Sequence, residues 1–323
     1  MWVVVLLAFG AGMQAVCVRR DRRRLPPPGR ILNGRHVRSV GDRGPAALFE
    51  AGIVASSANW SKVQSALEAS TRTWSYDRPG LGWSPPAAGG WSLQTLTDDL
   101  RALVRTIDPP RPFVLVGHSF GTYIVRTYAH RFPEDVAGLV LVDPVTSAEW
   151  TNPGWRGRVR LHRAVVFAHV ARGLAAMGLV RLGLWGLLRR GGGNAGPVLG
   201  LSPSMRRIAG EVAKLPADVI PALRAHWSEP GFFKVLATYV GAMPDCAAEA
   251  ARHPIPPGLA VTVLSGAHQS AENLAAQKAL ATRHVVVEGS GHWIHLDHPQ
   301  LVADAVLALT APETSSTDPA QRR

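Results

Sequence analysis

The most informative segment of this chain reads VLVGHSFGTY, from Val114 to Tyr123. Its first three residues are apolar, which is typical of a buried strand, and a helical pattern follows the serine. Glycines at 117 and 121 lack the Cβ atoms that would collide in a sharp turn between these two elements. Such a turn presents a serine hydroxyl in a strained position, so the pattern predicts that Ser119 is a nucleophile.

The composition excludes several classes of protein. With 323 residues, 46% of them hydrophobic and 18% charged, the chain is expected to be globular rather than disordered. Its two cysteines, Cys17 and Cys246, offer neither a disulfide framework nor the spacing of a metal site. The net charge of +12 is concentrated in residues 19–30, at +5, and 150–210, at +10, which leaves −3 elsewhere. This distribution favours contact with an anionic membrane surface over nucleic-acid binding.

The N-terminal residues 1–24 have the pattern of a membrane anchor with a basic flank. Trp2 to Val18 carries no charge, and five arginines follow by position 24. At 1.5 Å per residue, these seventeen uncharged residues just reach the lower limit for a spanning helix. A signal peptide, which would need its positive charge before the apolar run, and an interfacial helix are the alternatives. The positive-inside rule would place the rest of the chain on the cytoplasmic side.

Alternating strand and helix patterns indicate an α/β fold with a parallel, doubly wound sheet. After a loop-like linker at 25–43, strands are expected at 46–50, 71–76, 113–117, 138–142, 259–264 and 283–288, with helices at 92–107 and 299–310. Between 146 and 256 the patterns are only helical, at 157–190, 203–214, 216–227 and 231–243. An insertion between strands lies over their carboxyl ends, so it is expected to form a cap over the ligand site. The polar tail 313–323 is expected to be disordered.

Three further motifs accompany GHSFG at 117–121, namely DRPGLGWS at 77–84, LVDP at 141–144 and GHWIHLD at 291–297. In this order they resemble the α/β-hydrolase superfamily, in particular its cap-bearing branch of serine esterases, lipases and haloperoxidase-like enzymes. The resemblance covers about residues 44–145 and 257–310, and the two halves of the hydrolase core are expected at 44–145 and 257–312. It implies a mostly parallel α/β-hydrolase sheet with an inserted helical cap, and acyl-transfer chemistry that needs no cofactor or metal.

A serine nucleophile requires a base within hydrogen-bond reach and a carboxylate that orients the base. His292 follows the last expected strand, and the resemblance implies the order nucleophile, acid, histidine, so we expect His292 to be the base. The commoner family position for the acid, at 261–270, contains no carboxylate, and the first one beyond it is Glu272. The other family position follows the strand after the nucleophile. Asp143 stands there and is the expected acid, with Glu272 and then Glu149 as alternatives.

The oxyanion of an acyl-transfer intermediate needs hydrogen-bond donors that are in place before charge develops. The backbone N–H of Phe120, directly after the nucleophile, is one expected donor. The resemblance places the second in the loop after the first buried strand, where family members often carry His-Gly and this chain carries Ala51-Gly52. The donor carried over is the N–H of Ile53, and the histidine that commonly stands in this loop is missing.

The expected cap contains an apolar stretch at 164–188. Arg172 and Arg181 interrupt this stretch, and each would cost roughly 2.5–3.5 kcal/mol at the centre of a bilayer. A lid or interfacial helix that rests on anionic lipid is therefore expected, with a cap packed only on its own domain as the alternative.

The expected activity is hydrolysis of a carboxylic ester of a small or lipid-like apolar substrate, through an acyl-enzyme on Ser119. Amide, thioester and carbon–carbon bond hydrolysis use the same residues and stay open. The serine at position 119 disfavours the chemistry of the related epoxide hydrolases and dehalogenases, which use an aspartate there. The alternative from another class is a membrane-tethered binding protein that has a hydrolase scaffold and no catalysis.

Overall fold

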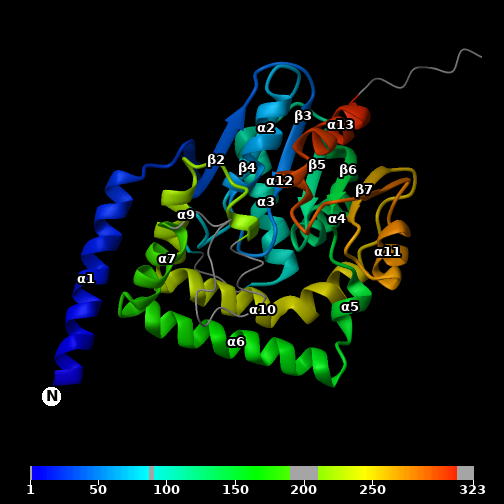
Figure 1. The fold of residues 1–323 in the computed structure, drawn as a ribbon. Helices are drawn as coiled ribbons and strands as arrows, with labels where there is room; N and C mark the ends of the chain where they lie inside the picture. Colours follow the sequence, from blue (N-terminus) through cyan, green and yellow to red (C-terminus); the bar gives the residue numbers. More distant parts are fainter. Residues whose placement is uncertain (1, 87–90, 190–209, 311–323) are drawn as a thin grey trace, which may run out of the picture.

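A computed structural model describes residues 2–86, 91–189 and 210–310 (Figure 1). Eight strands form one sheet in the order β1-β2-β4-β3-β5-β6-β7-β8. The strands are β1 (Arg30–Leu32), β2 (Arg35–Val40), β3 (Ala46–Glu50), β4 (Arg72–Tyr76), β5 (Phe113–His118), β6 (Val136–Val142), β7 (Ala260–Gly266) and β8 (Arg283–Val287). The pairs β1–β2 and β2–β4 are antiparallel, and all other pairs are parallel. The predicted mostly parallel sheet is confirmed.

Helices cover both faces of this sheet (Figure 1). Outside the cap these helices are α2 (Ser61–Leu67), α3 (Leu93–Ile107), α4 (Gly121–Arg131), α11 (Ala271–Lys278), α12 (Ile294–Asp297) and α13 (Pro299–Thr310), while α1 (Trp2–Arg24) lies to one side of the sheet. In β5, Val114 and Val116 pack with α2 and α13 on one face, while Phe113 and Leu115 pack with α3 and α4 on the other. Because strand side chains alternate between faces, one short apolar strand contributes to two cores.

The segment between β6 and β7 is helical. It contains α5 (Ser147–Thr151), α6 (Trp155–Ala176), α7 (Leu179–Arg189), α9 (Ile220–Trp227) and α10 (Pro230–Ala251). The long helices α6 and α10 lie side by side at one edge of the molecule (Figure 1). The single helix predicted over 157–190 is wrong, because Gly178 adopts a φ of 76° and separates α6 from α7. Most of the helix predicted at 203–214, and the tail 313–323, lie outside the described residues.

The prediction that 25–43 is only a linker is wrong, because β1 and β2 form a hairpin within it. Asn33 and Gly34 connect the two strands with φ values of 46° and 72°. Two consecutive residues with positive φ are required by the tight hairpin turn whose twist matches that of the strands, and Asn-Gly is its preferred sequence. This dipeptide was the signal for an antiparallel extension of the sheet.

The N-terminal segment forms one helix, α1, which contacts α6 and α9. Midway along it, the buried Gln14 donates a hydrogen bond to the Ser228 carbonyl at 2.7 Å and accepts one from Arg181 at 2.8 Å. Further contacts join Asp21 to Arg181 and Arg22 to Glu229. Within the described residues, no single helix is both long and apolar enough to cross a membrane, and α6 with the start of α7 passes such a test only as a pair bent by 92°. The predicted anchor is thus a helix docked on the cap.

Candidate active site

Ser119 lies at the sharp turn between β5 and α4, with a φ of 50°. A Cβ atom at Gly117 would lie 2.7 Å from the Val125 side chain, and one at Gly121 would lie 2.6 Å from the Ala51 carbonyl oxygen. Both positions therefore accept only glycine without displacement of their neighbours. The local sequence produces the strained turn that was expected around the nucleophile.

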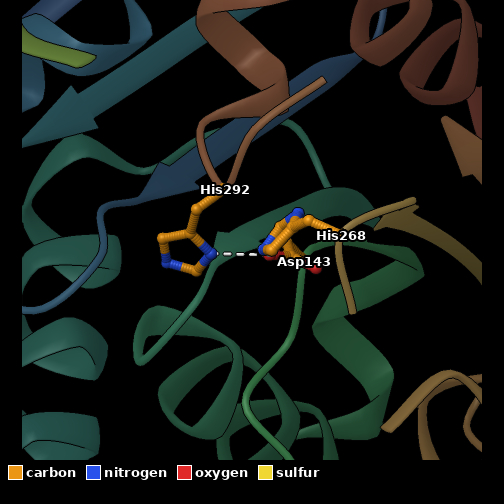
Figure 2. Close-up of side chains that lie close together, drawn as sticks. All are labelled: Asp143, His268 and His292. Atoms are coloured by element: carbon orange, nitrogen blue, oxygen red, sulfur yellow. Dashed lines mark hydrogen bonds and ion pairs between the residues drawn. The ribbon is translucent and has the colours of Figure 1, made fainter. Parts of the chain in front are cut away.

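His292 and Asp143 are joined directly, although 149 positions separate them. The Nδ1 atom of His292 lies 2.5 Å from Oδ2 of Asp143 (Figure 2). Asp143 follows β6 and His292 follows β8, and the carboxyl ends of parallel strands meet at one edge of the sheet. The carboxylate is fully buried, whereas the imidazole is 31% exposed. Asp143 accepts from Nδ1–H, which leaves Nε2 as the nitrogen that can take up a proton.

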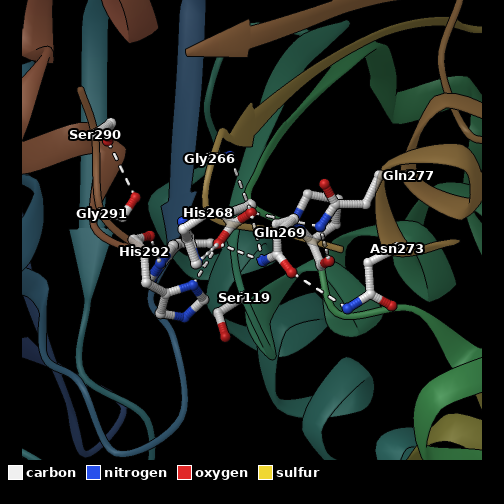
Figure 3. A network of polar contacts seen from close by, with 12 residues as sticks. Ser119, Gly266, His268, Gln269, Asn273, Gln277, Ser290, Gly291 and His292 are labelled. Atoms are coloured by element: carbon white, nitrogen blue, oxygen red, sulfur yellow. Dashed lines mark hydrogen bonds and ion pairs between the residues drawn. The ribbon is translucent and has the colours of Figure 1, made fainter. Parts of the chain in front are cut away.

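Amide groups hold the Asp143 carboxylate in place. The Gln269 side chain donates to both of its oxygens at 2.9 Å, and the Gly266 N–H donates at 3.2 Å (Figure 3). Gln277 adds a contact of 3.4 Å. Burial opposes the charged form, but the hydrogen bond and charge of His292, with the Gln269 and Gly266 donors, outweigh burial and lower the pKa of Asp143. Asp143 thus stays ionised and can stabilise a protonated imidazole.

The alternative acids are placed differently. Glu272 lies exposed in the first turn of α11, while His292 bonds to Asp143. The side chain of Glu149 lies outside the described residues. The segment 261–270, which holds the commoner family position for the acid, contributes Gln269, and this side chain donates hydrogen bonds to Asp143. An amide in that segment supports a carboxylate that comes from another strand.

Three other histidines lie near His292 and Asp143. His118 is buried and donates from Nε2 to the His292 carbonyl at 3.0 Å. His295 is fully buried against His118 and Trp60, and this burial, followed by the nearby His292 and Lys214, lowers the pKa of His295 to about 3. His268 was missed by sequence reasoning, and its Nε2 lies 3.7 Å from Asp143. Its only signal was its place after β7, at the same edge of the sheet.

Ser119, Asp143 and His292 line one cavity of about 560 Å³, together with both expected oxyanion residues, Phe120 and Ile53. Within the part of the chain that the structure describes, the N–H groups of Phe120 and Ile53 make no hydrogen bond, and Ser119 makes none to His292. Contacts between a nucleophile and its base are often longer without substrate. The cavity can therefore receive a carbonyl group next to a serine, a histidine and two backbone donors.

Asp143, His268 and His292 also offer ligand atoms that lie within 4.8 Å of one another, as a metal site requires (Figure 2). The 2.5 Å contact between Asp143 and His292, however, leaves no room for an ion between those two atoms, since metal bonds of about 2.0–2.1 Å to each would hold them farther apart. The arrangement suits a shared proton better than a metal ion.

Known proteins share both the sequence pattern and the fold. The chain is 30% identical over 104 residues to the uncharacterized protein YqjL of Bacillus subtilis, covering 32% of this chain and 41% of the relative. It is 32% identical over 108 residues to the 2-(acetamidomethylene)succinate hydrolase of Mesorhizobium japonicum, covering 33% and 38%. In both comparisons the match spans less than half of the relative's length.

A solved carboxylesterase structure from Nitrososphaera gargenis superimposes with a TM-score of 0.58 at 17% identity, over 85% of this chain and 93% of that one. This likeness concerns the fold alone. The sequence profile described as "Alpha/beta hydrolase family" matches residues 47–305, which include strands β4 to β8, β3 except for its first residue, and all of the predicted site. The chain therefore belongs to the alpha/beta hydrolase family.

Proposed function

We propose that this protein hydrolyses a carboxylic ester with a small or lipid-like apolar group, through an acyl-enzyme on Ser119. The observation that carries the proposal is the His292–Asp143 contact in a cavity that Ser119 also lines. Hydrolases among the similar proteins agree with the reaction class. The choice of ester over amide, thioester or carbon–carbon bond is part of the proposal.

The geometry supports a two-step reaction. The Nε2 atom of His292 takes the proton of Ser119 as its oxygen forms a bond to the ester carbonyl carbon, and the N–H groups of Phe120 and Ile53 donate to the resulting oxyanion. His292 then gives that proton to the leaving alcohol as the ester bond breaks. Water repeats the sequence on the acyl-enzyme and releases the acid. Throughout, Asp143 holds the His292 ring by Nδ1 and stabilises its positive charge.

The cavity lining supports an apolar substrate group. Its walls carry Ile53, Phe120, Val145, Trp150, Leu161, Val240, Met243 and Trp293. The polar side chains Gln269, Asn273 and Gln277 lie at the Asp143 end of the same cavity, and the charged Arg160 and Glu211 also line it. A group that is mostly apolar around one polar reacting bond matches this distribution.

Labelling with a fluorophosphonate tests the proposal. This reagent phosphonylates an activated serine, and we expect one equivalent on Ser119, located by peptide mass spectrometry, and none on Ser119→Ala. Hydrolysis of a series of p-nitrophenyl esters from acetate to palmitate then reads the preferred acyl length. Folded wild-type protein that is neither labelled nor active on esters would favour the binding-protein alternative. Cleavage of an amide or thioester with a higher kcat/KM than the matched ester would reassign the bond.

We also propose that the cap and α1 rest on an anionic membrane surface on the cytoplasmic side. Phe9 on α1, Trp155 on α6 and Leu182 on α7 are each about two-thirds exposed. On α6, Phe167 and Val170 are also exposed, and Arg156, Arg158, Arg163 and Arg172 are exposed beside them. The helix carries no acidic residue. Exposed apolar side chains among arginines complement anionic lipid.

Vesicle binding by the full chain tests the membrane proposal. We expect at least tenfold stronger binding to vesicles with 30% phosphatidylserine than to neutral ones, because each arginine near the surface contributes about 1 kcal/mol. The variant Arg163→Glu/Arg172→Glu should lose this preference. Arg43→Glu changes an exposed arginine in the loop before β3 and serves as the control. Equal binding of the wild type to both kinds of vesicle would refute the membrane proposal.

A further inference from the structure

The oxyanion loop, residues 51–55, is held by a buried arginine. Arg78 follows β4 and is 2% exposed. Its guanidinium donates to the Ala51 carbonyl at 2.6 Å and to the Gly52 carbonyl at 2.5 Å, and it pairs with the Glu50 carboxylate. These are the three residues that directly precede the expected donor, Ile53. The guanidinium therefore restrains the backbone on the N-terminal side of that N–H.

This loop contains a strained residue that needs such restraint. Val54, directly after Ile53, has a φ of 48°. A β-branched residue with positive φ is a conformational outlier, and outliers of this kind persist only where the surroundings enforce them. The Ala55 N–H also bonds to the Gly52 carbonyl, at 3.2 Å, so Arg78 and the backbone hold the same carbonyl oxygen. Without the guanidinium, Gly52 loses one of these two partners, and the strained turn is free to relax.

Arg78 also touches the other half of the predicted oxyanion site and the cap. Its guanidinium carbon lies 5.6 Å from the centre of the Phe120 ring and 5.1 Å from that of Tyr239. Its Nε donates to the Tyr239 hydroxyl at 3.0 Å. Tyr239 lies on the cap helix α10 and packs edge-on against Phe120. One side chain thus contacts the loop before Ile53, the ring of Phe120, and the cap.

We propose that Arg78 is a positioning residue that sets the two oxyanion donors, Ile53 and Phe120, and links them to cap helix α10 through Tyr239. It supplies the support that a histidine at position 51 would otherwise be expected to provide. The inference rests on the proposed function, because an oxyanion forms only if Ser119 attacks a carbonyl. Arginine suits this task since its planar fork donates five hydrogen bonds in fixed directions and stays protonated at all working pH values.

The first test compares Arg78→Lys and Arg78→Met with Arg101→Met. Arg101 is also a largely buried arginine paired with a carboxylate, that of Asp135, but it lies outside the cavity. We expect Arg78→Met to lower kcat about 10²-fold, the lower end of the loss for one oxyanion donor, with KM within about threefold. Arg78→Lys keeps the positive charge but has only one nitrogen donor, so its kcat should fall about tenfold. Arg101→Met should lower Tm and leave kcat unchanged.

The second test separates positioning from stability. A trifluoromethyl ketone adds to Ser119 and places a negative oxygen where the intermediate has one, whereas the product acid does not. In Arg78→Lys, we expect the ketone, which binds as a hemiketal of Ser119, to bind more weakly by the same factor as the loss in kcat. The affinity for the product acid should not change. A lowered Tm with wild-type kcat and wild-type hemiketal affinity would overturn the proposal.

Tyr239→Phe keeps the proposal testable if the Arg78 variants do not fold. It removes one hydroxyl that accepts from Nε, and we expect a loss of two- to fivefold in kcat and in hemiketal affinity. Wild-type values for both in Tyr239→Phe would then overturn the proposal. Failure of the proposed function is distinguishable, because wild-type protein would then show neither ester hydrolysis nor hemiketal formation before any variant is compared.

Discussion

Two groupings of serine, histidine and aspartate in the described part of the chain invite comparison. In one, His292 Nδ1 lies 2.5 Å from Asp143 beside the cavity that Ser119 lines. In the other, His36 Nδ1 lies 2.8 Å from Asp77 and 3.3 Å from the Ser57 hydroxyl. The His36 and Asp77 side chains have no exposed surface, whereas the His292 ring is 31% exposed.

The difference shows that distance alone does not make a catalytic set. A proton relay needs the serine and the carboxylate at different ring nitrogens, and both partners of His36 share Nδ1. Its Nε2 atom is buried without a partner among the described residues. Asp77 instead accepts the Ser57 and Trp83 backbone N–H groups and so orders the turn after β4. The exposure of the His292 ring and its place in the cavity that Ser119 lines distinguish the His292 grouping.

Replacement of each serine by alanine should give the largest difference in kcat between the two groupings. Ser119→Ala should lower kcat about 10⁶-fold, the loss seen when another serine hydrolase lacks its nucleophile. Ser57→Ala should keep wild-type kcat, because the backbone N–H of residue 57 still donates to Asp77. Ester hydrolysis by the two purified variants measures this. Comparable losses in both would mean that the buried grouping takes part in the reaction.

Replacement of single carboxylates by their amides tests whether Asp143 is the acid that orients His292. Asp143→Asn should lower kcat about 10⁴-fold, because an amide favours the wrong imidazole tautomer. Glu272→Gln should leave kcat unchanged. Asp77→Asn should lower the free energy of unfolding by roughly 1–3 kcal/mol, since buried donors lose a charged acceptor, and it should keep kcat. A larger loss of kcat in Glu272→Gln than in Asp143→Asn would reverse the assignment.

Removal of the amide that holds Asp143 should have a smaller effect. Gln269→Leu leaves Gly266 and Gln277 as donors to the carboxylate, so we expect kcat to fall by about tenfold, less than the 10²-fold that a 1 Å misplacement can cost. His268→Ala, which removes a side chain 3.7 Å from Asp143, is the matched comparison and should change kcat less. The reverse ranking would assign the support of Asp143 to His268.

The buried pair of Asp77 and His36 should affect the stability of the protein in acid. Burial opposes the charged form of Asp77, but the hydrogen bond and charge of His36 and two backbone donors outweigh it, so the pKa of Asp77 lies below its ordinary value of 3.8. A lowered folded-state pKa adds stability above pH 3.8 that is lost as the pH falls through the folded value. Urea unfolding at pH 6 and pH 3 measures this effect. Between these two pH values, the free energy of unfolding should fall less for Asp77→Asn than for the wild type. Equal losses would contradict the assigned charge.

Local patterns predicted much of the sheet but not its first edge. The segment around β3 was predicted with the observed bounds, and Ser92 caps α3 by accepting from the Thr95 N–H. These features depend on neighbours in sequence, which the chain itself displays. The β1–β2 hairpin was missed although Asn33-Gly34 signals it, because its short strands carry charged residues and show no clear alternation. Gln269 and His268 were missed because no local pattern marks a second layer around a carboxylate.

The chain alone predicted Ser119 as the nucleophile and specified its strained turn, since Gly117 and Gly121 lie within two residues of Ser119. From the sequence, Asp143 was only one of three carboxylates that could pair with His292. The pairing became definite through the parallel register of β6, β7 and β8, which brings their carboxyl ends to one edge. The placement of Arg78 under the oxyanion loop likewise required the folded chain. Such contacts join residues far apart in sequence, so their partners are set by packing rather than by local propensity.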